Sequence, residues 1–261
     1  MTPYNAAAIQ WRSELEGWAI PEKILAAAPE TPWGFPVDLF KAPEQIVPSP
    51  SRARALDRLA DGGSVLDVGC GGGAAALALV PPAGLVVGFD ASAAMLAEFA
   101  AHAERCGVAH REIEGSWPAD AERADIADVV ACHHVLYNVP DLPPFVDALS
   151  AQARRRVVVE LTSSHPLVAT RGLWQHFHGI DRPGGPTADL AFAALSEMGL
   201  SPQRETWSRP PRPAQRELLI SLNRRRLCLP VSAEPEVDRV MGEWDGLAAS
   251  RDMATIWWDL D

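Results

Sequence analysis

The sequence predicts an α/β protein with a doubly wound, mostly parallel seven-stranded sheet, an antiparallel edge hairpin, a helical N-terminal cap and a helical C-terminal extension. Three observations predict this fold. Short apolar segments alternate with helical patterns, a glycine-rich turn follows the first such segment, and 261 residues are enough to bury a large core. The expected division is a cap over residues 1–50, an α/β domain over 51–225 and an extension over 226–261.

The elements are expected in a regular order. In the cap, Trp11, Leu15 and Trp18 have roughly helical spacing. Compact apolar runs then predict strands, and the stretches between them predict helices. The strands are expected at 64–69, 85–90, 108–114, 127–133 and 155–161, and the helices at 74–80, 92–105, 142–152 and 187–199.

The last part of the domain predicts the edge hairpin. The segments SPQRETWSR (201–209) and QRELLISLNR (215–224) are interpreted as two strands joined by the short link PPRP. Residues 226–261 are expected to form a helical tail. The long connection at 162–186 is expected to be a lid over the site, because long loops inside a compact domain are usually functional.

Composition excludes several classes of function. The formal net charge of -11 disfavours nucleic acid as a partner, and no apolar run is long enough for a membrane span. The N-terminus lacks a secretory signal, so a cytoplasmic location is expected, and the arginine and alanine bias favours a bacterial source. Four widely separated cysteines form no C-x-x-C pair, which argues against disulfides and a cysteine zinc site. Whether the chain forms a homodimer is left open.

The glycine-rich turn is the first candidate site. It carries Asp67, Gly69, Gly71 and Gly73 between a strand and a helix. Glycines let a backbone approach a ligand closely, and the helix N-terminus offers free N–H groups. A nicotinamide-binding turn would read G-x-G-x-x-G, which the segment matches imperfectly and with an acid placed ahead of the glycines.

An acid followed by glycines at alternate positions resembles the first motif of the class I S-adenosylmethionine-dependent methyltransferases. The resemblance extends over about residues 60–222 as strand order and spacing. It implies a Rossmann-like domain that binds S-adenosylmethionine. It also implies that Asp67 orients the loop and the methionine amino group, and that Gly69, Cys70 and Gly71 lie against the cofactor.

Asp90 ends the second expected strand, where a carboxylate can accept both hydroxyls of a ribose. Its alternative role is to cap the next helix, although Ser92 fits that role as well. The resemblance implies that Ala91 and Met95 line the adenine. Ser116 stands where many members of the family have an acid for the adenine amino group. Trp117 either stacks on the base or packs in the core.

The fourth expected strand resembles the family's fourth motif, which opens onto the transferred methyl group. Cys132 is therefore expected beside the cofactor, and His133 is predicted to be the catalytic base, with a structural histidine as the alternative. If the strand continues through both histidines, His134 lies on the face of the strand opposite to His133. Together with Tyr137 it is expected to contact the acceptor.

The connection at 162–186 supplies two more expected acceptor contacts, Trp174 and His176. The alternative is a short amphipathic helix that packs Leu173, Trp174 and Phe177 inward. No metal site is expected, because His176 and His178 have a poor spacing for one helix face and no carboxylate cluster accompanies them.

These observations predict methyl transfer from S-adenosylmethionine to oxygen or nitrogen of a small-molecule acceptor. Cap aromatics are expected to exclude water from the site: Trp11, Trp18, Trp33 and Phe35. One alternative is a nicotinamide-dependent oxidoreductase on the same sheet. The other is a non-catalytic protein that binds S-adenosylmethionine, which the serine at position 116 favours mildly.

Overall fold

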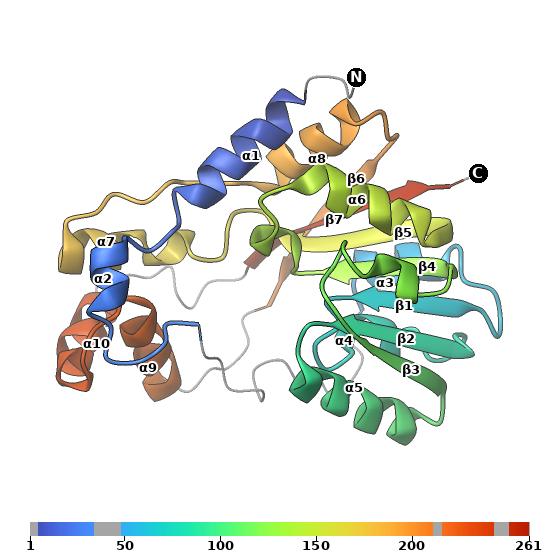
Figure 1. Cartoon of the computed structure of the whole chain (residues 1–261), viewed down its shortest axis with the longest axis horizontal. Helices are drawn as coiled ribbons and strands as arrows, with labels where there is room; N and C mark the ends of the chain where they lie inside the picture. The colour runs from blue at the N-terminus through green and yellow to red at the C-terminus, as the bar shows by residue number, and fades with distance from the viewer. Residues whose placement is uncertain (1–4, 34–47, 211–215, 243–250, 261) are drawn as a thin grey trace.

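The computed structural model describes residues 5–33, 48–210, 216–242 and 251–260. Its centre is one seven-stranded sheet with the order β3-β2-β1-β4-β5-β7-β6 (Figure 1). The strands are β1 (Ser64–Val68), β2 (Leu85–Asp90), β3 (Ala109–Glu114), β4 (Ala127–His133), β5 (Ala153–Thr162), β6 (Gln203–Arg209) and β7 (Arg251–Asp259). Only β7 runs antiparallel to its neighbours, so the expected mostly parallel sheet with an antiparallel edge is confirmed.

Helices cover both faces of the sheet (Figure 1). One face carries α3 (Pro50–Leu56), α4 (Ala74–Leu77) and α5 (Ala93–Cys106). The other carries α1 (Ala6–Glu16), α6 (Leu142–Ala151) and α8 (Ala188–Glu197). Each face buries its own apolar cluster, which is why the central strands are nearly continuous apolar runs.

A third apolar cluster holds together a helical lobe beside the sheet (Figure 1). The lobe contains α2 (Glu22–Ala26), α7 (Arg171–His178), α9 (Arg216–Arg226) and α10 (Glu234–Gly242). Its fully buried side chains include Leu173 of α7 and Val237 of α10. No helix in the described ranges is long and apolar enough to cross a membrane.

Two expectations about the C-terminal part are wrong. The described part of QRELLISLNR belongs to helix α9, where Leu219, Ile220 and Asn223 follow helical spacing and face the lobe. The tail is not helical throughout, because its last segment is strand β7, whose residues 253–258 are all buried. The hairpin therefore pairs β6 with β7 across a long connection instead of the proline-rich link, of which residues 211–213 lie outside the described residues.

The connection at 162–186 does not form the expected lid. Its helix α7 turns Leu173 and Trp174 inward against the lobe, as the amphipathic-helix alternative requires. The cap aromatics are also placed elsewhere. Trp11 is fully buried and donates from Nε1 to the carbonyl of Val139 at 2.8 Å, and Trp18 stacks on His165 with ring centroids 4.7 Å apart. Trp33 is 56% exposed, and Phe35 lies outside the described residues.

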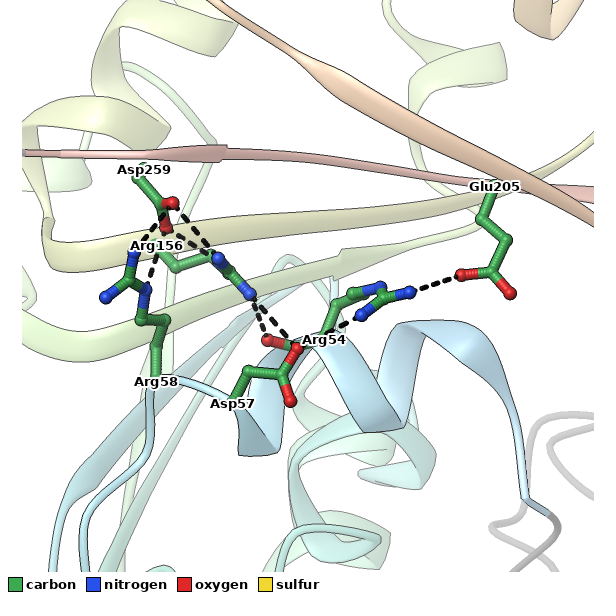
Figure 2. Close-up of polar contacts among 6 residues, drawn as sticks. All are labelled: Arg54, Asp57, Arg58, Arg156, Glu205 and Asp259. Carbon is green, nitrogen blue, oxygen red and sulfur yellow. Dashed lines mark hydrogen bonds and ion pairs between the residues drawn. The ribbon is translucent and has the colours of Figure 1, made fainter.

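A network of ion pairs connects strands β5, β6 and β7 with one another and with the segment of α3 (Figure 2). Arg156 of β5 donates through Nε and Nη2 to the two carboxylate oxygens of Asp259, at 2.8 and 3.0 Å, and Arg58 donates to the same carboxylate. Arg54 bridges Asp57 and Glu205. Hydrogen bonds from Arg156 and Arg58 lower the pKa of Asp259 to about 2, against a smaller opposing effect of burial.

We predict that Asp259→Asn lowers the free energy of unfolding by about 1–3 kcal/mol, because it removes the carboxylate that accepts two hydrogen bonds from the buried guanidinium of Arg156. The longer ion pair of Arg156 with Asp57, at 3.7 Å, remains. The pKa of Asp259 lies below its value in the unfolded chain, so the stabilisation is present above pH ~4 and is lost as the pH falls towards 2. Denaturant unfolding at several pH values measures both effects. Asp125→Asn is the control, since its pair with Arg111 is exposed; an equal loss in both variants contradicts the prediction.

Candidate functional site

A cavity of about 1030 Å³ opens at the carboxyl edge of the sheet. The strands contribute side chains at or near their ends: Val68 of β1, Asp90 of β2, His133 of β4, Glu160 of β5 and Arg209 of β6. The strand order reverses between β1 and β4, and open α/β sheets bind ligands at such a switch point. The cavity is therefore the candidate functional site.

The glycine turn forms the floor of this cavity. The N–H groups of Gly69 and Cys70 both donate to the carbonyl of Phe89, at 2.7 and 3.2 Å. Gly69 has φ +71, and a Cβ there would lie 2.4 Å from Cγ2 of Val135. Only glycine therefore fits this position. Gly71 lines the cavity as well.

Asp67 ends up almost fully buried beneath the turn. Its Oδ2 accepts a hydrogen bond from the N–H of Ala76 at 3.1 Å. Burial raises the pKa of Asp67 to about 7, the charge of Asp90 adds to the shift, and the bond from Ala76 opposes it. Burial therefore disfavours the ionised form of this carboxyl. Burial also raises the pKa of the Cys70 thiol, which stays protonated.

Asp90 joins the turn to the end of β2. Its Oδ2 accepts from the N–H of Gly71 and its Oδ1 accepts from the N–H of Ser92, both at 2.9 Å. The helix that follows is capped by Ser92, whose hydroxyl accepts from the N–H of Met95 at 3.4 Å. Asp90 is not the helix cap. Ala91 and Met95 lie beside it in the cavity wall.

Ser116 and Trp117 also line the cavity. The N–H of Ser116 donates to Asp120 at 2.8 Å. The indole of Trp117 lies edge-on to Phe89 with centroids 5.1 Å apart and donates to the carbonyl of Phe145 at 3.2 Å. The ring is therefore fixed by core packing while it contributes to the wall.

Two consecutive histidines end the fourth strand. His133 is paired in register with Glu160 and lines the cavity. Burial lowers the pKa of His133 to about 4, and the charges of His134 and Arg209 lower it further against the attraction of Glu160. His133 is therefore neutral at pH 7. His134 has φ +62, lines the same cavity and has a side chain that is 44% exposed.

Four expected site residues do not line the cavity. Cys132 is fully buried on the opposite face of β4, and the hydroxyl of Tyr137 donates to the carbonyl of Thr162 at 2.6 Å. Trp174 is buried in the lobe, with the guanidinium of Arg182 3.9 Å from its ring centroid. His176 pairs with Glu236 on the surface of the lobe, at 2.9 Å. Cys132 alternates with His133 along β4 and therefore faces the core on the other side of the sheet. Packing of the cap and lobe, which the sequence pattern does not reveal, accounts for the positions of the other three.

The sequence reasoning missed a polar cluster at the end of β5. Glu160 is 2% exposed, and its carboxylate contacts Ser51, Arg209 and His134. One signal was available, since Glu160 is a lone acid in the apolar run RRVVVEL. Arg209 and Ser51 carry no comparable signal. The described residues contain no group of three or more His, Cys, Asp or Glu side chains that could hold a metal ion.

Comparisons with known proteins bear on this site. A family model described as "Methyltransferase domain" matches residues 44–187. The chain is similar to two proteins named ubiquinone biosynthesis O-methyltransferase. The protein from Leptothrix cholodnii is 35% identical over 124 residues, covering 45% of this chain and 52% of that protein. The protein from Pectobacterium carotovorum is 38% identical over 88 residues, covering 33% and 37%. The matches thus span about half or less of these relatives' length.

A solved structure has the same fold. The YcgJ protein from Bacillus subtilis superposes with a TM-score of 0.55 over 80% of this chain and 97% of that chain. The two sequences are 18% identical, so the likeness concerns the fold.

We predict a pH-dependent stability term from Asp67. Its folded-state pKa of about 7 lies above the unfolded value, so the folded state retains a proton that the unfolded state releases. The stabilisation is complete below pH ~4 and is lost as the pH rises through 7, by at most about 1.4 kcal/mol per pH unit. Asp67→Asn removes this term. The stability of the wild type relative to this variant should therefore fall between pH 5 and 7 in denaturant unfolding, and a constant difference would contradict the burial argument.

Proposed function

The chain belongs to the methyltransferase-domain family, and we propose that it transfers the methyl group of S-adenosylmethionine to an oxygen or nitrogen of a small-molecule acceptor. The observation that carries the proposal is the meeting of the glycine turn, Asp67 and Asp90 in one cavity at the switch point of the sheet. The predictions of a cytoplasmic location and a bacterial source rest on the sequence and belong to the same proposal.

The donor set fits this cofactor. Burial raises the pKa of the Asp67 carboxyl, and the methionine ammonium would supply a cation that favours its ionised form. Asp90 would accept from the ribose hydroxyls, and the apolar atoms of Ala91, Met95 and Trp117 would surround the adenine. When bound, the cofactor supplies a methyl group on a sulfonium, ready for in-line displacement. The protein's part is to hold the acceptor in line with it.

The acceptor would occupy the rest of the cavity. Pockets for small molecules usually measure about 300–1,000 Å³, so a cavity of about 1030 Å³ has room for an acceptor beside the cofactor. The polar side chains at this end are His133, His134, Glu160 and Arg209. The curated relatives are named O-methyltransferases, which favours an oxygen acceptor.

Two alternatives remain testable. A nicotinamide-dependent oxidoreductase could use the same sheet, but membership of the methyltransferase-domain family argues against it. A non-catalytic binding protein would need the cofactor site alone. The two imidazoles that line the cavity beyond that site favour an enzyme.

Calorimetric titration tests the proposal directly. We expect S-adenosylmethionine and S-adenosylhomocysteine to bind in the micromolar range and NAD not to bind. Transfer from methyl-labelled S-adenosylmethionine to a panel of hydroxyl compounds and amines then separates the enzyme from a binding protein. Binding of NAD alone would refute the proposal, and cofactor binding without transfer to any member of the panel would favour the non-catalytic alternative.

Asp90→Ala is expected to weaken binding of S-adenosylmethionine at least tenfold, because it removes the ribose acceptor and also the bond that holds Gly71 in the turn. The matched control is Glu114→Ala. Glu114 is the register neighbour of Asp90 at the end of β3, and its side chain is exposed and outside the cavity wall. Calorimetry of both variants measures the effect, and equal affinities would remove Asp90 from the site.

A further inference from the structure

Resting on the proposed methyl transfer, we propose that His134, held by the buried carboxylate of Glu160, is the base that takes the proton from a hydroxyl acceptor. The proposal narrows the acceptor to hydroxyl compounds and places the base one residue beyond the strand end. It rests on the placement of His134 in the cavity and on the contacts that surround Glu160.

The backbone turns the side chain of His134 into the cavity. Its N–H donates to the carbonyl of Glu160 at 2.7 Å, so it is still attached to β5 after β4 has ended. At φ +62 it has a left-handed conformation, which is uncommon for residues other than glycine. This conformation breaks the alternation of the strand, and both His133 and His134 line the cavity as a result. The imidazole of His134 is 44% exposed and can reach an acceptor and water.

Glu160 is arranged to hold an imidazole. The hydroxyl of Ser51 donates to its Oε2, and Nη2 of Arg209 donates to its Oε1 at 2.5 Å. Nε2 of His134 lies 3.2 Å from the same Oε1. Burial alone would raise the pKa of Glu160, but the hydrogen bonds from His134 and Ser51 and the ion pair with Arg209 oppose this effect, and the pKa is held well below its usual range. The group is therefore ionised and can only accept hydrogen bonds.

The ionised carboxylate selects the tautomer of His134. A proton on Nε2 faces Oε1 of Glu160, which leaves the lone pair on Nδ1 available as a base. Nη1 of Arg209 lies 3.4 Å from the same Nε2, and because a guanidinium can only donate, this contact by itself would favour a proton on Nδ1. We give more weight to the shorter contact with the carboxylate, at 3.2 Å. Glu160 is thus a positioning residue for His134. The charged groups facing this imidazole are Glu160 of β5, Arg209 of β6 and His133 of β4.

His133 is less suited to the role. Its pKa of about 4 makes it a weak base, and a base works best when its pKa lies near the working pH. Its imidazole is also more enclosed than that of its neighbour. His133 would serve as part of the wall against which the acceptor lies.

In the proposed step, every bond that forms or breaks and the transferred proton are accounted for. The acceptor oxygen forms a bond to the methyl carbon as the carbon–sulfur bond breaks, and the electron pair of that bond stays on sulfur. The proton of the hydroxyl goes to Nδ1 of His134, where the carboxylate of Glu160 stabilises the imidazolium. The products are a methyl ether and S-adenosylhomocysteine. The proton then leaves to water through the exposed side of the ring.

Nuclear magnetic resonance of the protein with ¹⁵N-labelled histidine tests the arrangement without any acceptor. The signals of His134 are assigned from their loss in His134→Gln. We expect neutral His134 to carry its proton on Nε2, and Glu160→Leu to lose this preference because no carboxylate is left to accept from Nε2. His110, which pairs with Glu112 on β3, is the internal control and should not change. A proton on Nδ1 in the wild type, or the same preference for Nε2 in Glu160→Leu, would overturn the proposal.

Arg209→Met removes the guanidinium and keeps the carboxylate of Glu160, so the proton of His134 should stay on Nε2, and a proton on Nδ1 in this variant would also overturn the proposal. This variant provides the test if Glu160→Leu does not fold. Activity provides the second measurement, on the hydroxyl compounds of the panel, with catechol as the first probe. His134→Gln should reduce kcat about 100- to 10,000-fold while the affinity for S-adenosylmethionine changes less than threefold, and His110→Gln should change neither. Equal turnover in His134→Gln, or methylation of amines only, would refute the inference. Absence of cofactor binding in the wild type would instead refute the proposed function.

Discussion

The close approach of the glycine turn to the ends of β2 and β4 is the constraint on which the site depends. Two N–H groups of the turn share the carbonyl of Phe89, and a third, from Gly71, is fixed by Asp90. On its other side the turn meets Val135, with no space for a Cβ at Gly69. These contacts bring three strand ends into one cavity. A side chain at Gly69 would separate the turn from Val135 and change the position of every group above it.

Two buried carboxyls in this cavity have opposite electrostatics. For Asp67, burial raises the pKa to about 7, and no cation contributes to this shift among the residues that the structure describes. Glu160 is just as buried, yet its contacts with Arg209, Ser51 and His134 keep it ionised. Paired groups whose surroundings separate their pKa values commonly divide the chemistry of a site between them. Here the carboxyl of Asp67 is suited to bind a cationic ligand. The carboxylate of Glu160, which already accepts several hydrogen bonds, is suited to orient a neighbouring side chain.

Most of the sheet could be predicted from the sequence, because its central parallel strands β1, β2, β4 and β5 contain short apolar runs, each followed by a turn or helix. The glycine turn and Asp90 were likewise predictable, since they depend on local backbone geometry. The segment QRELLISLNR was not, because a short apolar run fits a strand and a buried helix equally well. Trp174 and His176 were misplaced for another reason. Their positions are set by the packing of α7 against α10, which is separated from it in sequence.

The position of strand β7 in the sheet explains how Arg209 reaches Glu160. Because it runs antiparallel between β5 and β6, β6 has the same direction as β5, and both carboxyl ends lie at the cavity. Arg209, the last residue of β6, can therefore reach Glu160. At the far end of β7, Asp259 pairs with Arg156 of β5 and so fixes the register of the two strands. Ion pairs at one edge of the sheet thus help to set the geometry of the carboxylate at the other.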